Sequence, residues 1–131
     1  PGADNPFHGK TTLLPRLTQP QLWALFKLAD VFVSPSSHDG TPNTLLEAMA
    51  CGCFPVVGDI ESLAEWIADG VNGLLVDPHS PDALANGILT ALKQKELRQS
   101  AARRNLEIIR SQAAQSATLP KIKSYYEQFL D

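Results

Sequence analysis

Glu47, in the middle of the chain, is a carboxylate among small and apolar residues, of a type that could bind a diol. Asp39 and Glu47 lie eight positions apart in SSHDGTPNTLLEAMACGCFPVVGD (36–59), and Glu47 is the one charged residue between Asp39 and Asp59. A carboxylate among apolar residues must be paired or hydrogen-bonded, or it takes up a proton. A vicinal diol such as a ribose would satisfy both of its oxygens. A solvent-facing position, or an ion pair with an Arg or Lys of the same domain, would also explain it.

The segment around Asp39 is typical of a loop that leads into a helix start at a ligand. The stretch SPSSHDGTPNT is rich in small, turn-forming residues. Thr41 and Pro42 suit the N-cap and the first helical position. A helix start offers unpaired N–H groups and a partial positive charge, which suit a phosphate, and Gly40 permits close approach of the backbone. The sequence contains neither a P-loop nor a G-x-G-x-x-G fingerprint.

The hydrophobic pattern around this loop predicts alternating strands and helices. Strands are predicted over residues 30–34 and 54–58 and within 72–77; helices are predicted from 18 to about 28, over 43–51 and 62–69, from 81 to about 93, and from 96 to about 111. Gly52 is predicted to end the second helix in a left-handed conformation. PFHGK could hold a further short strand, and Thr118 could cap a last helix.

The order of these elements favours the α/β class, as a Rossmann-like three-layer domain with a parallel sheet and helices on both faces. Ligands of such sheets lie beyond the carboxyl ends of the strands, so residues 35–43 and 58–62 are predicted to form the ligand edge. One domain is expected over residues 1–131. Within it, residues 1–4 are interpreted as a vector-derived remnant, 5–110 as the Rossmann-like core and 111–131 as a C-terminal tail helix.

The composition argues against several classes of protein. A net charge of −3 does not favour a nucleic-acid groove or an anionic membrane, and no apolar run approaches the roughly 20 residues that span a bilayer. No signal peptide or cluster of metal ligands is visible, so we expect a cytoplasmic protein that needs neither a metal nor another cofactor. Cys51 and Cys53 are poorly spaced for a disulfide or a zinc site, and two buried, reduced thiols are expected.

The stretch DGTPNTLLEAMACGCFPVVGDIESLAEWIADGVNGLLVDP closely resembles the donor-binding half of the family 4 retaining glycosyltransferases (group 1 glycosyl transferases), which have the GT-B fold of two Rossmann-like domains. The E-x7-E signature of that family lies within E-G-x-G-x-x-x-L-E-A-M-A-x-G-x-P-V-V, and Asp39 and Glu47 keep its eight-residue step. The likeness extends from about Phe7, in F-x-G before ADVFVSPS, through Asp77 and the following helix. It implies the C-terminal half of a GT-B fold, truncated at its N-terminus.

The resemblance also implies roles for individual residues. Glu47 matches the glutamate that binds the ribose hydroxyls of a nucleotide-sugar donor. Asp39 matches the acidic residue near the transferred sugar, where it would contact sugar hydroxyls or support charge at the anomeric centre, so these two are the catalytic candidates. The backbone amides of Asn43 and Thr44 match the diphosphate site, where fixed N–H dipoles take up the charge of the leaving group.

Further donor contacts are implied around this pair. Gly40 and Thr41 would lie against the sugar. His8 and Lys10 fall where the loop of the family approaches the base, and His38 is a candidate for touching the donor. Exposed loop positions are the alternative for His8 and Lys10.

Two positions depart from the pattern of the family. Residue 39 is Asp in place of the usual Glu, so its side chain is one methylene shorter. Pro42 occupies the place of a common glycine and cannot donate an N–H. Either change could alter the sugar preference, and Asp39 could instead serve as a turn-forming residue before Gly40.

The basic pair that binds the diphosphate in this family, and the whole N-terminal acceptor domain, are expected upstream of Pro1. The chain is therefore interpreted as a fragment that is inactive alone. Its expected partners are a nucleotide-sugar donor, a glycan or lipid acceptor and the missing acceptor domain, through which the protein could associate peripherally with a membrane. A second copy of the fragment could pair through the aromatic stretch YYEQF; no nucleic acid is expected.

The predicted function of the parent enzyme is transfer of a sugar from a nucleotide diphosphate sugar to a saccharide or lipid-linked acceptor, with retention at the anomeric carbon. Another GT-B enzyme, such as a nucleotide-sugar epimerase, is one alternative, and the spacing of Asp39 and Glu47 argues against it. A non-catalytic nucleotide-binding or interaction module is the other.

Overall fold

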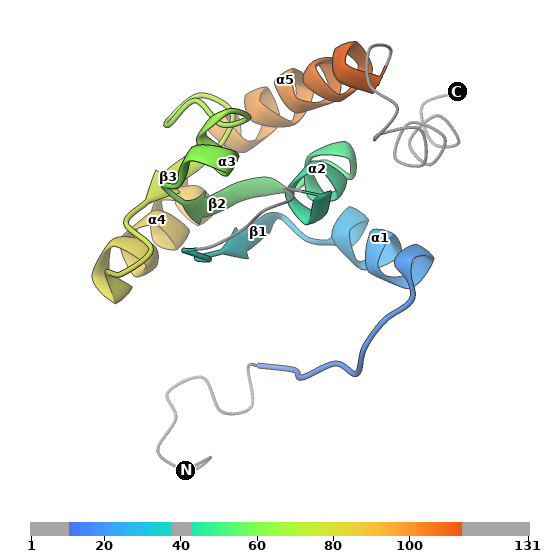
Figure 1. Cartoon of the computed structure of the whole chain (residues 1–131), viewed down its shortest axis with the longest axis horizontal. Helices are drawn as coiled ribbons and strands as arrows, with labels where there is room; N and C mark the ends of the chain where they lie inside the picture. The colour runs from blue at the N-terminus through green and yellow to red at the C-terminus, as the bar shows by residue number, and fades with distance from the viewer. Residues whose placement is uncertain (1–10, 38–42, 114–131) are drawn as a thin grey trace.

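A computed structural model describes residues 11–37 and 43–113 of the protein. Helices and strands alternate along this part of the chain (Figure 1), in the order α1 (Gln19–Leu28), β1 (Val31–Ser34), α2 (Asn43–Ala50), β2 (Phe54–Gly58), α3 (Glu61–Ala64), β3 (Leu74–Val76), α4 (Pro81–Lys93) and α5 (Lys95–Ala113). None of the helices in the described residues is long and apolar enough to cross a membrane.

The strands form one parallel sheet in the order β1-β2-β3. Val33 lies opposite Val56 between the first two strands, and Val56 lies opposite Leu74 between the second and third. The central strand β2 is buried along its whole length. Parallel neighbours need a crossover connection, which α2 provides between β1 and β2 and the segment that contains α3 provides between β2 and β3. The predicted α/β class with a parallel sheet is confirmed.

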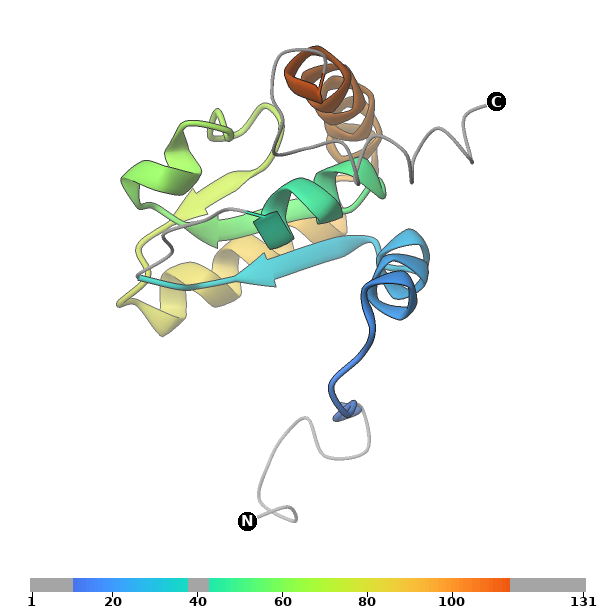
Figure 2. The ribbon, with the colours of Figure 1, turned by 45° about the vertical axis from the view of Figure 1, so that its right-hand side comes forward.

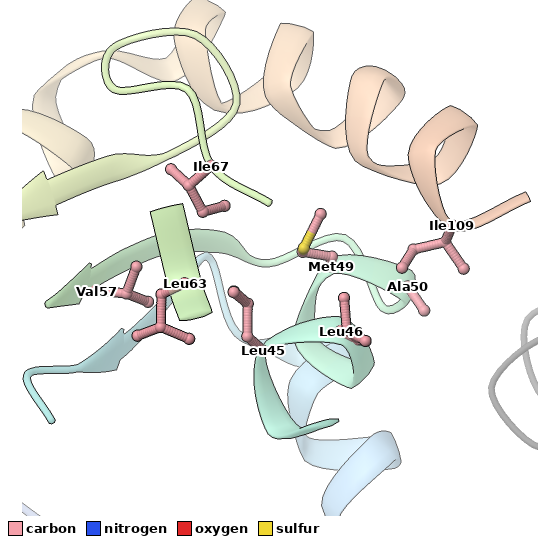
Figure 3. Close-up of a cluster of buried hydrophobic side chains, with 8 residues drawn as sticks. All are labelled: Leu45, Leu46, Met49, Ala50, Val57, Leu63, Ile67 and Ile109. Atoms are coloured by element: carbon pink, nitrogen blue, oxygen red, sulfur yellow. The ribbon is translucent and has the colours of Figure 1, made fainter. Parts of the chain in front are cut away.

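Helices cover both faces of the sheet, and Figure 2 shows α2 and α4 on opposite sides of it. Val57 of β2 points into the core shared with α2, α3 and the end of α5, whereas its neighbour Val56 points into the core shared with α4. This alternation follows from the two-residue period of a strand. Figure 3 shows the first core, formed by Leu45, Leu46, Met49, Ala50, Val57, Leu63, Ile67 and Ile109.

The first helix begins and the second ends where local sequence signals place those boundaries. Thr18 caps α1 in a capping box, because its hydroxyl accepts from the Gln21 N–H at 3.4 Å while its own N–H donates to Gln21 Oε1 at 2.9 Å. Gly52 has a φ of +92°, as predicted. Its N–H donates to Met49 O at 3.2 Å and the Cys53 N–H to Ala48 O at 3.0 Å, which is the Schellman arrangement.

The third helix is shorter than predicted. The sequence pattern predicted a helix over residues 62–69, but α3 spans only Glu61–Ala64. Its continuation is blocked by the side chain of Asn72, whose Oδ1 accepts from the Ala68 N–H at 2.7 Å and whose Nδ2 donates to Trp66 O at 2.8 Å. These backbone groups bond to a side chain instead of to the helical partners four residues away, so the part of the prediction beyond Ala64 is wrong.

The other predicted elements agree with the structure to within about two residues at each end. The strand suggested within PFHGK and the helix suggested from Thr118 lie outside the described residues.

Both cysteines are free thiols in environments that disfavour the thiolate. Cys53 is buried, as expected, and its Sγ donates to Phe26 O at 2.9 Å. Cys51 is only half-buried, contrary to the expectation that both are buried. Burial, with neighbouring Cys53 and Glu47 adding to it, raises the pKa of Cys51 to about 12. Burial and the Asp30 carboxylate raise the pKa of Cys53 to about 11.

We expect iodoacetamide to alkylate both cysteines slowly in the folded protein, because the thiolate is the reactive form. The rate should still be rising above pH 9.0, the ordinary thiol pKa, and should level off only near pH 11 to 12. Since the unfolded chain gives up these protons first, the stability contributed by the two thiols is complete below pH 9.0 and is lost as the pH rises through 11 to 12. Measuring alkylation against pH, with and without urea, checks this; a plateau near pH 9 in the folded protein would contradict it.

Candidate functional site

The loop after β1 lies directly on the carboxyl end of β2. Gly58 is the last residue of β2, and a Cβ there would overlap the carbonyl oxygen of Ser36. Only glycine allows two backbones to come this close. On the next strand, Val76 O accepts from the Asp59 N–H at 2.7 Å. The described parts of the two segments predicted to form the ligand edge therefore meet at one edge of the sheet.

Helix α2 combines an exposed start with a buried remainder. Asn43 and Thr44 are exposed in its first turn. Leu45 and Leu46 are buried in one core with Leu63, which follows the carboxyl end of β2, and Figure 3 shows Leu45 on the side of Leu63. The start of α2 therefore lies toward the carboxyl edge of the sheet, the position that a helix needs for its N–H groups and dipole to meet an anionic ligand.

Glu47 is buried in this helix, with 9% of its surface exposed. Gln19, at the start of α1, donates a hydrogen bond from its Nε2 to Glu47 Oε1 at 2.9 Å. Among the described residues, Gln19 is the only hydrogen-bond partner of this carboxylate. Glu47 is thus not solvent-facing, and no Arg or Lys among the described residues pairs with it. These were the two alternative explanations of this carboxylate that the sequence allowed. A neutral amide holds it instead.

The structure brings some of the predicted site residues together in α2 and does not describe the others. Asn43, Thr44 and Glu47 lie within the first five residues of the helix. The remaining candidates lie outside the described residues: His8, Lys10, His38, Asp39, Gly40 and Thr41. In the described part of the chain, no group of three or more His, Cys, Asp or Glu side chains is placed to hold a metal ion.

Sequence reasoning missed Gln19 as a partner of Glu47. The two residues are 28 positions apart, and their contact depends on how α1 lies against α2. The one local signal was the position of Gln19 between the N-cap Thr18 and Pro20, which places it in a first helical turn. That position says nothing about which distant side chain it meets.

Sequence reasoning also missed a pair of buried amides that fixes α5 to the segment before β3. Asn72 and Asn105 are 2% and 0% exposed. Asn72 Nδ2 donates to Asn105 Oδ1 at 3.0 Å, and Asn105 Nδ2 donates to Asn72 O at 3.1 Å. Because Ile109 of α5 belongs to the core beneath α2, this pair helps to hold the helix that carries Glu47.

A groove of about 700 Å³ lies between the segment after α3 and α5. Its lining combines Trp66, Ile67 and Ile108 with the charged Arg103 and Glu107. None of its lining residues belongs to α2, so it is separate from the predicted site.

Comparisons with known proteins agree on one family. The family model described as "Glycosyl transferases group 1" matches residues 7–107. O-antigen chain mannosyltransferase B of Escherichia coli is 34% identical over 101 residues, which cover 77% of this chain and 26% of the mannosyltransferase. D-inositol 3-phosphate glycosyltransferase of Pseudarthrobacter chlorophenolicus is 42% identical over 77 residues, or 59% of this chain and 18% of that protein.

A solved structure shows the same fold. Sucrose-phosphate synthase from Thermosynechococcus elongatus superimposes with a TM-score of 0.75 at 24% identity, over 90% of this chain and 30% of that one. The likeness confirms the predicted match to part of a GT-B glycosyltransferase. The chain spans about a quarter of the length of the mannosyltransferase, at 26%. With a family model that matches residues 7–107, the chain belongs to the group 1 glycosyl transferases.

Proposed function

We propose that this chain is the donor-binding domain of a retaining glycosyltransferase, which transfers a sugar from a nucleotide diphosphate sugar to an acceptor. The observation that carries the proposal is the buried Glu47 carboxylate, held by a neutral partner one turn behind the exposed start of α2. Membership of the group 1 glycosyl transferases supports it.

In this proposal each part of α2 has a task in holding the donor. The Glu47 carboxylate accepts hydrogen bonds from the ribose hydroxyls. The backbone amides of Asn43 and Thr44, with the helix dipole behind them, bind the diphosphate and take up its charge as the glycosyl bond breaks. No metal ion is needed for that step, because fixed N–H dipoles supply the stabilisation.

The remaining site residues are proposed from the resemblance alone. Asp39 lies near the transferred sugar and supports charge at the anomeric centre, with Gly40 and Thr41 against the sugar. His8, Lys10 and His38 are proposed as further contacts with the base or the sugar.

The acceptor is proposed only as a class. One relative is named as an O-antigen chain mannosyltransferase and another as a D-inositol 3-phosphate glycosyltransferase, so the names of these two relatives point to different acceptors. We propose a saccharide or a lipid-linked glycan for this protein. We propose that sugar transfer requires the longer protein with its acceptor domain, and that the 131-residue chain alone does not catalyse it.

A panel of nucleotides tests the proposal on the intact protein that carries this chain. UDP, GDP and ADP, and the sugar derivatives of each, are titrated by calorimetry and by thermal shift. We expect at least one nucleoside diphosphate to bind and to raise the melting temperature, because a ligand that binds only the folded state stabilises it. Inorganic phosphate is the control and should not reproduce the shift. No response to any nucleotide would overturn the donor-site assignment.

A further inference from the structure

We propose that Gln19 is a positioning residue for Glu47, which holds one carboxylate oxygen so that the other stays free to accept from the donor. This inference rests on the proposed function, because it requires Glu47 to contact a ribose. It is carried by the 2.9 Å hydrogen bond from Gln19 Nε2 to Glu47 Oε1. Among the described residues none bonds to Glu47 Oε2, and the proposal assigns that oxygen to a ligand hydroxyl.

The backbone of Gln19 is held in place from both ends of α1. At the start of the helix, the capping box between Thr18 and Gln21 fixes the turn that contains Gln19. Toward the other end, Phe26 lies in a small core with Ala48 of α2, and its carbonyl oxygen accepts from Cys53 Sγ at 2.9 Å. The amide therefore approaches Glu47 from a helix whose position on α2 is already set.

The chemistry of an amide suits a carboxylate that must keep an acceptor. An amide N–H donates one hydrogen bond to an ionised carboxylate and leaves its negative charge in place. An Arg in the position of Gln19 could take both oxygens of Glu47 in a bidentate pair. A carboxylate in the position of Gln19 would repel Glu47. A neutral, single donor fixes the orientation of Glu47 and leaves its second oxygen to the ligand.

The test uses ligands with and without the hydroxyls that Glu47 would bind. On the intact protein, Kd is measured by calorimetry for UDP, GDP and ADP and for the 2′,3′-dideoxy form of each. Gln19→Leu, which keeps the bulk and removes the donor, is expected to weaken the best-bound ribonucleotide about tenfold, the effect of a lost hydrogen bond to a charged group. The dideoxy form should bind as before. In turnover, KM for the donor should rise while kcat changes less.

Two further variants and one control make the result specific. Gln19→Asn, whose amide is too short to reach Glu47, should reproduce the loss if Gln19→Leu folds poorly. In a Glu47→Ala background, Gln19→Leu should cause no additional loss, because coupled residues are not additive. Gln99→Leu removes an exposed glutamine on α5 and should leave Kd unchanged.

Each outcome separates this inference from the function on which it rests. If Gln19→Leu weakens ribonucleotide and dideoxynucleotide equally, or only lowers the melting temperature, Gln19 has a structural role and the inference is wrong. If Glu47→Ala weakens the ribonucleotide but both Gln19 variants do not, the inference fails and the proposed function stands. If Glu47→Ala has no effect, or no probe binds, the proposed function itself is overturned and the inference falls with it.

Discussion

Glu47→Gln is expected to weaken binding of the nucleoside diphosphate about 10- to 100-fold, and to reduce sugar transfer by at least as much. The new amide has the same size and can still accept from Gln19, but it has lost the negative charge and one acceptor. A hydrogen bond to a charged group is worth about 1.5–3 kcal/mol, and each 1.4 kcal/mol is about tenfold in Kd. Calorimetric titration with UDP, GDP and ADP, together with turnover of the intact protein, measures both effects. Glu47→Ala should abolish transfer.

Two controls separate the effect of losing the Glu47 carboxylate on binding from any effect on folding. Glu107→Gln removes a carboxylate from an exposed position on α5 and should change neither binding nor turnover. Urea unfolding of Glu47→Gln should show nearly unchanged stability, because the side chain keeps its volume and its bond to Gln19. Full affinity and full activity in Glu47→Gln would show that the ribose does not lie at this residue.

Asn105→Ala is expected to lower the free energy of unfolding by about 2–4 kcal/mol. Asn105 is fully buried, and its loss leaves one of the two side-chain N–H groups of Asn72 and the Asn72 carbonyl without their partners. A buried polar group that loses its partner costs about 1–3 kcal/mol. Urea unfolding should show a lower midpoint with an unchanged slope, which identifies a change in stability.

An exposed asparagine supplies the control for this prediction. Asn86 lies exposed in α4, so Asn86→Ala should be neutral or slightly stabilising, because Ala has the higher helix propensity. In the double variant Asn72→Ala with Asn105→Ala, the combined loss should be smaller than the sum of the single losses, since the two amides share one network. A loss below about 0.5 kcal/mol in Asn105→Ala would mean that water replaces the network.

Most of the fold could be predicted because its signals are local. The bounds of β2 and α4 follow from a continuous apolar run and from the helical spacing that begins at Pro81. The left-handed conformation of Gly52 could be predicted because the residue that ends a helix often has a positive φ, which a residue without a Cβ adopts most easily. The helix over 62–69 was predicted too long because the nearby Asn72 side chain bonds to the Ala68 N–H and to Trp66 O, and hydrophobic periodicity does not reveal such a side-chain bond.

The candidate site could likewise be predicted only in part from the sequence. The motif with its eight-residue step identified Glu47, and the alternation of elements placed Asn43 and Thr44 at the helix start beside it. The degree of burial of Cys51 could not be predicted, because a cysteine at the end of a helix is covered or exposed according to what packs against that end.

The sequence by itself determined the class of the sheet, the helix that carries Glu47 and the family, because hydrophobic period, capping residues and motif spacing act over a few neighbouring residues. Only the tertiary structure decided what surrounds that carboxylate. Gln19 reaches it across 28 residues, and Asn72 meets Asn105 across 33. Such contacts depend on how the helices pack against the sheet and one another, and one sequence carries no local signal for the distant partner of a single amide.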